Sequence, residues 1–435
     1  MSTPVPEQKS HGGASTSPWI VHKFGGSSVA DADCFRRVAE IVRDQPATRL
    51  AVVLSACRGV TDALLSIVSS AERGSPWNAD HDRLRAQHAA IAGEVLGETA
   101  ATAYLGDLDN DLRDIGGVLQ TIQLSRTAPR NLSELISGYG ETWSSLLFAR
   151  MLEASGQRVQ WLDARRALVV EWGPLGPAVD WQRSQANLDA LVSSDFQGAL
   201  VITGFIASDQ RGAQTILGRN GSDFSASIFG ALLKAAEIQI WTDVDGVLSA
   251  DPRRVPEALV IDALSYNEAM ELAYFGAKVL HPQTMGPAVA HGIPVRIRNT
   301  FAPRRPGSVI CAKPPAGPPV KGITCIEEVA LITLEGAGMI GVPGTAHRLF
   351  GALREAGVSV ILISQGSSEH SICCAVPRAQ SDIAAAALRA AFERELREGQ
   401  IQNVDVDNNL AILAVVGDGM AGTPGVAAKV FGALA

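Results

Sequence analysis

The sequence has little that would suit a membrane or a nucleic acid. It contains no run of 18 apolar residues, so we expect no transmembrane helix. It contains no block of Lys or Arg, and a net charge of −8 argues against nucleic acid or an anionic membrane surface as a partner. Residues 1–17 have no apolar segment, so we interpret them as a disordered leader rather than a secretory signal.

Cysteine and histidine are also scarce and unpatterned. The six cysteines form no CxxC pair, and Cys373 and Cys374 are adjacent. We therefore expect reduced, buried thiols and a cytoplasmic protein. The eight histidines show no HExxH or zinc-finger spacing, so no protein-held metal site is predicted.

The chain of 435 residues is long enough for two or three domains. From Trp19 to about Asn299, short β-type runs alternate with helical stretches, which is typical of an α/β domain with a parallel sheet. We expect residues 78–155 to be mostly helical, with a break at "SGYGE" (137–141). The expected strands are "WIVHKF", "RLAVVLSA", "RVQWLDA", "GALVITGFIA", "EIQIWTDV" and "IPVRIRN".

The C-terminal part contains an internal repeat. Residues 329–353 align with residues 410–434 at an offset of 81, with twelve identities in one register. The first copy continues as strand, strand, helix and strand, which predicts the β-α-β-β-α-β order of a ferredoxin-like module. The predicted segments are a leader (1–17), an α/β domain (18–312), a Pro-rich linker (313–322), a first module (323–408) and a partial second module (409–435).

The second copy stops inside its first helix. One strand and one helix cannot bury an apolar stripe unaided. We therefore expect the natural polypeptide to continue and this chain to be a fragment. The stripe consists of Val426, Val430, Phe431 and Leu434.

The stretch "KFGGSS" (23–28) has the composition of a phosphate cradle. Lys23 ends a predicted strand, and Gly25 and Gly26 let a bulky anion approach the backbone. Ser28 and Asp31 have the S-x-x-D spacing of a helix cap, whose free N–H groups favour anions. The lysine precedes the glycines, unlike in the G-x-x-x-x-G-K-[ST] loop, and a simple tight turn is the alternative interpretation.

Three further junctions carry similar residues. In "LGRNGSDFSA" (217–226), Arg219 suits a carboxylate and Asp223 lies at the start of a helix. "WTDVDGVLSADPRRV" (241–255) crowds several acids into one loop, which requires either solvent or a linked cation. "YFGAKVLHPQT" (274–284) places Lys278 after a glycine, although a solvated surface lysine is the usual case.

In this order, KFGGSSV, GRNGSD, WTDVDGV…DPR and FGAKVLHP resemble the signature of aspartate kinase (aspartokinase). The tandem modules resemble the ACT domains of that family, and the stretch 358–372 is most similar to the bifunctional aspartokinase–homoserine dehydrogenases. The resemblance implies a three-layer, carbamate-kinase-like amino-acid-kinase sandwich, followed by ferredoxin-like ACT modules of which the second is truncated.

The resemblance also implies roles for individual residues. The implied catalytic residues are Lys23, Asp223 and Lys278. The implied contacts of aspartate are Ser55, Thr61, Glu141 and Arg219, the glutamate with its amino group and the arginine with a carboxylate. The implied ATP contacts are Lys23, Gly25, Gly26, Ser27, Thr242, Asp243, Leu248, Arg253, Lys278 and Val279. Leu248 stands where relatives commonly carry tyrosine, and Tyr139 where they carry histidine or arginine.

The implied reaction is ATP-dependent phosphorylation of the aspartate side chain, the first step towards lysine, threonine and methionine, with Mg²⁺ bridging phosphate oxygens. The ACT modules imply feedback by an amino acid, for which threonine is our expectation and Gln365 the expected contact. Module-to-module packing is the alternative role of the Gln365 segment. The modules also imply a homo-oligomer, and truncation of the second predicts that feedback is lost in this fragment.

Two other functions remain open. The chain could be a different amino-acid kinase, although the VLHP segment and the ACT repeat count against this. It could also be a non-catalytic regulatory or assembly chain. The charged set of Lys23, Arg219, Asp223 and Lys278 disfavours that second alternative.

Overall fold

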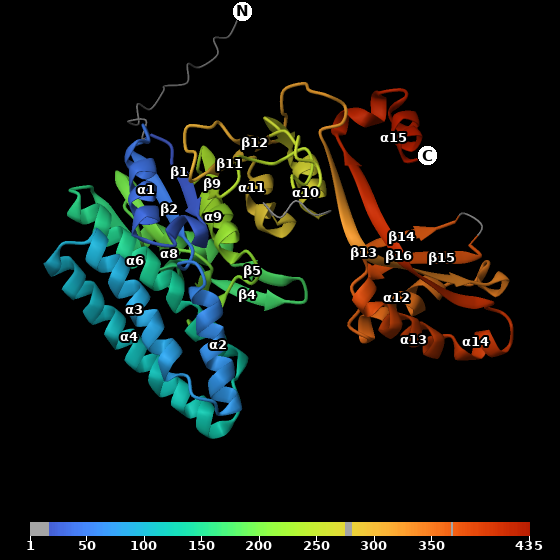
Figure 1. Cartoon of the computed structure of the whole chain (residues 1–435), viewed down its shortest axis with the longest axis horizontal. Coiled ribbons are helices and arrows are strands. Elements are labelled where there is room, and N and C mark those ends of the chain that lie inside the picture. Colours follow the sequence, from blue (N-terminus) through green and yellow to red (C-terminus); the bar gives the residue numbers. More distant parts are fainter. Residues whose placement is uncertain (1–16, 275–280, 367–368) are drawn as a thin grey trace, which may run out of the picture. The chain divides into compact units, whose positions relative to one another are not determined.

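The computed structural model describes residues 17–274, 281–366 and 369–435 of the chain (Figure 1). The chain forms two compact units. The first comprises the described residues up to Leu248, together with 257–273 and 281–317. The second comprises the described residues of 318–435 together with 249–256 and Tyr274. Within the expected linker (313–322), residues 313–321 contain neither helix nor strand, and Gly322 already belongs to a strand.

The first unit is built on an eight-stranded sheet with the order β10-β12-β11-β9-β1-β2-β6-β3. All neighbouring strands are parallel except β11 and β12. This confirms the α/β class, and all six expected strand regions form strands. The strands are β1 (Ile20–Phe24), β2 (Arg49–Leu54), β3 (Val159–Leu162), β6 (Gly198–Thr203), β9 (Glu237–Thr242), β10 (Ala263–Ser265), β11 (Val295–Asn299) and β12 (Ser308–Cys311).

Helices cover both faces of this sheet, which gives the three-layer sandwich. Phe24, Val52 and Leu54 alternate along their strands and pack into one core with apolar residues of the N-terminal helices. Helix α9 contacts β1, β2 and β9 from the other face. The helices are α1 (Ala32–Arg43), α2 (Val60–Arg73), α3 (Asn78–Val95), α4 (Glu98–Ser125), α5 (Arg130–Ser137), α6 (Tyr139–Ala154), α7 (Ala164–Ala167), α8 (Trp181–Leu191), α9 (Gly221–Leu232), α10 (Tyr266–Tyr274) and α11 (Gly286–Ala290).

The expected helical stretch 78–155 consists of α3 to α6 (Figure 1). Tyr104, Leu108, Leu112, Ile115 and Leu119 repeat at helical spacing and are buried, which explains why α4 stays docked over its 28 residues. Helices α5 and α6 meet at Gly138, inside the predicted break.

Two hairpins were not expected. The first joins β4 (Val170–Gly173) and β5 (Gly176–Val179), and the second joins β7 (Ile206–Ser208) and β8 (Gln214–Ile216). The predicted strand "GALVITGFIA" is therefore wrong as a single element. It turns at Gly204 and Phe205, where Phe205 adopts a left-handed backbone with φ 66°, and its second half leaves the main sheet for the second hairpin.

The second unit contains a four-stranded antiparallel sheet with the order β14-β15-β13-β16 and helices packed on one side. The element order confirms the ferredoxin-like plan. The elements are β13 (Gly322–Glu335), α12 (Thr345–Glu355), β14 (Leu362–Gln365), β15 (Ser371–Pro377), α13 (Ser381–Ala391), α14 (Glu393–Arg397), β16 (Asn403–Val416) and α15 (Val426–Leu434).

The sequence repeat is visible in the structure. Strands β13 and β16, and the starts of α12 and α15, are each 81 residues apart. The antiparallel register is symmetric under this offset, because Gly322 pairs with Val416 and Glu335 pairs with Asn403. The predicted boundary at 408/409 falls inside β16, which runs without interruption from one copy into the other. No residue of α15 is buried, and Phe431 is 71% exposed.

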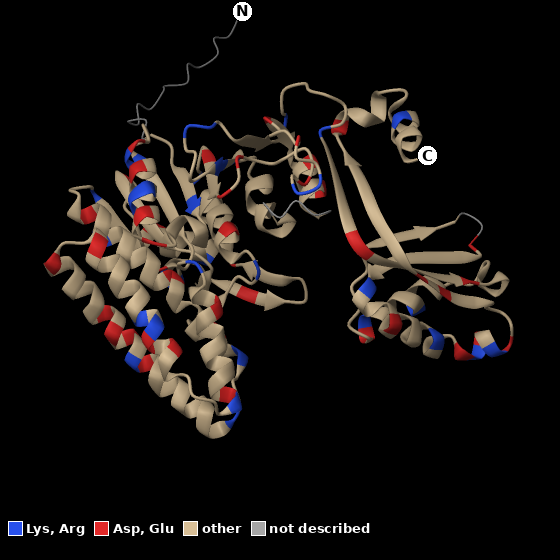
Figure 2. Ribbon diagram, in the orientation of Figure 1, with Lys and Arg blue, Asp and Glu red and all other residues tan. Residues whose placement is uncertain are grey.

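No helix within the described ranges is long and apolar enough to cross a membrane. Acidic and basic residues are interspersed along α3 and α4 and do not form a basic face there (Figure 2). Arg85 on α3, for example, pairs with Asp109 on α4 at 2.6 Å. All six cysteines are free thiols, but only Cys34, Cys57 and Cys374 are buried as expected, whereas the other three are half-buried.

Candidate active site

A cavity of about 420 Å³ opens where β1, β2 and β6 end. Lys23 is the last residue but one of β1, Ser55 directly follows β2, and Phe205 lies two residues after β6. Because these strands are parallel, their carboxyl ends share one edge of the sheet, where open α/β folds bind ligands. The lining includes nine of the predicted site residues: Lys23, Gly25, Gly26, Ser27, Ser55, Thr61, Glu141, Arg219 and Asp223.

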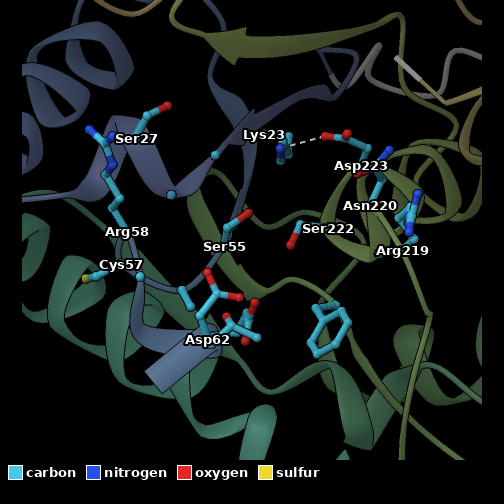
Figure 3. Close-up of a pocket in the computed structure, with 18 of the residues that line it drawn as sticks. Lys23, Ser27, Ser55, Cys57, Arg58, Asp62, Arg219, Asn220, Ser222 and Asp223 are labelled. Carbon is cyan, nitrogen blue, oxygen red and sulfur yellow. Dashed lines mark ion pairs between the residues drawn. The ribbon is translucent and has the colours of Figure 1, made fainter. Parts of the chain in front are cut away.

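Lys23 and Asp223 form an ion pair in the cavity (Figure 3). The distance from Nζ of Lys23 to Oδ1 of Asp223 is 2.6 Å, and each side chain is 12% exposed. Asp223 lies in the first turn of α9, which begins directly after the loop that carries Arg219. Partial burial strengthens the pair relative to a surface ion pair, so Asp223 fixes the direction of the lysine.

The two glycines after Lys23 have different surroundings. A Cβ at Gly25 would lie 3.4 Å from Nζ of Lys23, so Gly25 keeps the space beside the ammonium group open. A Cβ at Gly26 would lie 3.0 Å from the carbonyl oxygen of Ala56, so Gly26 allows close packing against the loop after β2.

The predicted cap at Ser28 is wrong. Ser28 is buried in a short 3₁₀ helix (Gly26–Val29), and its hydroxyl is 2.7 Å from that of Thr300. Helix α1 begins later, and Asp31 caps it by accepting a hydrogen bond from the N–H of Cys34 at 2.9 Å. The sequence spacing was that of a capping box, but the chain makes one further turn before the helix starts.

Glu141 is the most perturbed acid of the cavity. It is 4% exposed, and its Oε2 has no hydrogen-bond partner among the described residues. Desolvation raises the pKa of Glu141 to about 8, against smaller opposing effects from backbone N–H groups and Lys23. Helix α6 holds it there, since the hydroxyl of Ser144 donates to the carbonyl of Ser55 at 2.7 Å. An unpaired buried carboxyl in a cavity is suited to a cationic group of a ligand.

Arg219 and Arg58 supply positive charge on opposite sides of the cavity (Figure 3). Both are exposed, and neither forms an ion pair with any residue that the structure describes. Arg58 lies beside Ser27, and Arg219 lies beside Asn220 and Asp223. The cavity can therefore accept anionic groups at both ends.

Sequence reasoning missed several lining residues, including Arg58. The signal was present, because "SACRGVTD" (55–62) places an arginine and a glycine between β2 and α2. The other lining residues that were not predicted are Ala56, Cys57, Gly59, Asp62, Phe205, Gly218, Asn220, Gly221 and Ser222. Cys57 is buried, and desolvation raises the pKa of its thiol to about 12, so it is a poor nucleophile.

The remaining predicted nucleotide contacts are not part of this lining. Thr242 is the last residue of β9, which lies beside β1, and Asp243 follows it. The carbonyl oxygen of Trp241 would lie 4.0 Å from a Cβ at Gly25. Leu248 is half-buried and bridges to Val260. Lys278 and Val279 fall outside the described residues.

The crowded acids of 241–255 are balanced by neighbouring side chains. Asp245 accepts a hydrogen bond from Asn299 at 2.8 Å and pairs with Arg305. Arg253, a further predicted nucleotide contact, is exposed and pairs with Asp251 at 2.7 Å, which lowers the pKa of that acid to about 2. Within the described part of the chain, no group of three or more metal-ligating side chains occurs.

Comparisons with known proteins identify the families of the two parts of the chain. Residues 18–299 match the amino acid kinase family, and residues 332–392 match an ACT domain. The chain is 40% identical over 427 residues to the chloroplastic bifunctional aspartokinase/homoserine dehydrogenase 2 of Arabidopsis thaliana, covering 96% of this chain and 46% of that protein. The chain thus spans about half the length of this relative.

Shorter relatives match over nearly their whole length. The lysine-sensitive aspartokinase 3 of Escherichia coli is 33% identical, with 95% of this chain and 90% of that protein covered. The crystal structure of E. coli aspartokinase III with aspartate and ADP superimposes with a TM-score of 0.78 at 30% identity, covering 95% of this chain and 91% of that one.

Proposed function

The chain belongs to the amino acid kinase family, among its aspartokinases, and we propose that it transfers the γ-phosphoryl group of ATP to the side-chain carboxylate of L-aspartate. The observation that carries this proposal is the single cavity lined by Lys23, Glu141 and Arg219. It offers one group for phosphate, one for an ammonium group and one for a carboxylate. We also propose the cytoplasmic location expected from the sequence.

The attacking group needs no general base. An unperturbed aspartate side chain has a pKa of about 3.9 and is already ionised at pH 7. The obstacle is the repulsion between this carboxylate and the polyphosphate, so catalysis consists of positioning and charge neutralisation. Lys23 would neutralise phosphate charge, and Asp223 would orient Lys23. Arg219 would bind a carboxylate of aspartate, and Glu141 would bind its ammonium group.

Magnesium fits this site as part of its substrate. Mg²⁺ commonly binds through substrate phosphates, water and one or two carboxylates rather than through a protein cage. Besides Glu141, which is assigned to the ammonium group of aspartate, the lining contains the carboxylates of Asp62 and Asp223, which could contribute. The ion would offset charge on the phosphate oxygens.

The direct test is to trap an acyl phosphate with hydroxylamine. We expect hydroxamate to form only when both ATP and L-aspartate are present, and glutamate to be a poor substrate. Preference for glutamate would support a different amino-acid kinase, and no product with either amino acid would support the non-catalytic alternative.

We further propose that the first ACT module binds an amino-acid effector. Gln365, at the end of β14, lines a cavity of about 330 Å³ together with Gly344, Thr345 and Ala346 at the start of α12. Glu369 closes the same cavity, and its carboxylate accepts a hydrogen bond from the N–H of Gly341 at 3.0 Å. The helix start offers N–H groups for a carboxylate, and the Gln365 amide can bond an ammonium or hydroxyl group. Threonine is our candidate.

Replacing Gln365 by alanine is expected to weaken threonine binding at least about tenfold, because one good polar contact is worth about 1.4 kcal/mol. Calorimetric titration with threonine, and with lysine for comparison, measures this directly. Gln402→Ala is the matched control, since Gln402 is an exposed glutamine of the same unit outside the cavity. Equal threonine affinity in the Gln365 variant and the wild type would contradict the assignment.

A further inference from the structure

Outside the cavity, four side chains form a closed ring of contacts that joins β4, β8 and α5. Trp172 donates its Nε1–H to Oγ1 of Thr215 at 3.0 Å, and Thr215 donates to Oε2 of Glu134 at 3.0 Å. Glu134 pairs with Nε of Arg130 at 2.6 Å. The guanidinium carbon of Arg130 lies 4.6 Å from the centre of a Trp172 ring, which completes the ring of contacts. We refer to these four residues as the Trp172 ring.

One side of the Trp172 ring borders the loop that carries Arg219. Gly218 has a left-handed backbone with φ 78°, and a Cβ there would lie 3.5 Å from Cη2 of Trp172. The carbonyl of Gly218 accepts a hydrogen bond from the N–H of Gly221 at 3.0 Å, so the loop is a tight turn into α9. Because Arg219 has no ion-pair partner among the described residues, its position depends on this backbone.

The other side of the Trp172 ring fixes the helix junction that carries Glu141. Gln214, next to Thr215 on β8, donates to the carbonyls of Glu134 and Leu135, both at 3.0 Å. These residues lie in the last turns of α5, which Gly138 joins to α6, and Glu141 lies in the first turn of α6. Strand β8 is therefore attached both to the loop of Arg219 and to the helix junction of Glu141.

We propose that Trp172 and Thr215 are positioning residues that set the spacing between Arg219 and Glu141, and so the affinity for the amino-acid substrate. This inference rests on the proposed function, in which Arg219 binds a carboxylate of aspartate and Glu141 binds its ammonium group. The phosphate end of the cavity is built by β1 and the loop beside Ser27 and Arg58, opposite Arg219 (Figure 3). Among the described residues, the side-chain contacts of the Trp172 ring do not include Ser27, Arg58 or Lys23, so the ring should act on aspartate and not on ATP.

The first variant is Thr215→Val, which keeps the side-chain volume and removes both hydrogen bonds. Thr215 is buried, so Trp172 and Glu134 would each lose a partner. We expect the KM for aspartate to rise about tenfold, since small displacements of substrate-holding groups have effects of this size or larger. The KM for ATP and kcat should stay within about twofold of the wild type.

Two further variants and one control complete the experiment. Thr215→Ser keeps the hydroxyl group, so its KM for aspartate should stay near the wild-type value. Trp172→Phe removes the Nε1–H and should raise the KM for aspartate. Trp181→Phe is the matched control, because Trp181 has the same 40% exposure as Trp172 but its ring lies against His291 and not against the Trp172 ring. That variant should behave as the wild type.

The outcomes separate this inference from the proposed function. If the wild type forms hydroxamate while Thr215→Val and Trp172→Phe keep its KM for aspartate, the inference alone is overturned. An equal rise in the KM values for aspartate and ATP would also overturn it, since that indicates general damage. A wild-type chain that forms no hydroxamate overturns the proposed function, and the inference with it.

Discussion

Lys23→Ala is expected to lower kcat by about 10²–10³-fold, the size of the effect when a fixed donor to developing charge is removed. Lys23 lies between the two ends of the cavity (Figure 3), and its Nζ is 2.6 Å from Oδ1 of Asp223. Without it, the ionised nucleophile meets an unshielded polyphosphate, and Asp223 adds a further negative charge.

The measurement is the rate of hydroxamate formation at saturating ATP and aspartate, with the melting temperature as a check on folding. Lys234→Ala is the matched control, because Lys234 is exposed and follows the far end of the 12-residue helix α9. Asp223→Asn should lower kcat less than Lys23→Ala, because the lysine remains and only its orientation is weakened. Turnover near the wild-type rate in Lys23→Ala would refute the assignment of Lys23 to the phosphate.

The parallel sheet and the cavity edge were predictable because their signals are local. The expected strands are short, largely apolar runs, and several carry a charged or hydroxyl residue at or just after their carboxyl end, as Lys23 does in β1 and Ser55 does after β2. Parallel strands bring such positions to one edge of the sheet. The sequence could therefore indicate which residues meet without giving any distance between them.

The features that sequence reasoning missed depend on tertiary contacts. The β4–β5 hairpin reads "VEWGPLGPAV", where Gly and Pro break the strand pattern, and only the indole of Trp172 packed near Gly218 reveals its relation to the site. The sequence repeat placed a module boundary at 408/409, which falls inside strand β16. Pairing along both halves of β13 keeps it extended, with the register shifting between Ile326 and Leu331.

The second large effect concerns pH and Glu141. Burial raises the pKa of this carboxyl to about 8, so the free chain holds it mostly protonated at pH 7. If the ionised form binds the ammonium group of aspartate, binding must release a proton. The KM for aspartate should then fall about tenfold per pH unit between pH 6 and 8 and level off above pH 8. A KM for aspartate that is constant over this range would contradict the role of Glu141.

The raised pKa of Glu141 also affects the stability of the folded chain. As pH rises, aspartate binding should improve while the free energy of unfolding should fall. The folded-state pKa of about 8 lies above the model-peptide value of 4.5, so between these values the folded chain keeps a proton that the unfolded chain has lost. The free energy of unfolding therefore falls as pH rises through this window, by about 1.4 kcal/mol per pH unit from this group.

Glu141→Gln removes that loss, so the stability advantage of this variant over the wild type should grow from pH 6 to pH 8 in urea titrations. Its kcat/KM for aspartate should fall at least about 10²-fold, because a neutral amide replaces the ionic partner of the ammonium group. Glu153→Gln, an exposed position on the same helix, should change neither quantity. A carboxyl that destabilises the free chain and is needed only when substrate is bound is the expected signature of a binding group, whereas a structural glutamate would lose stability on the same substitution.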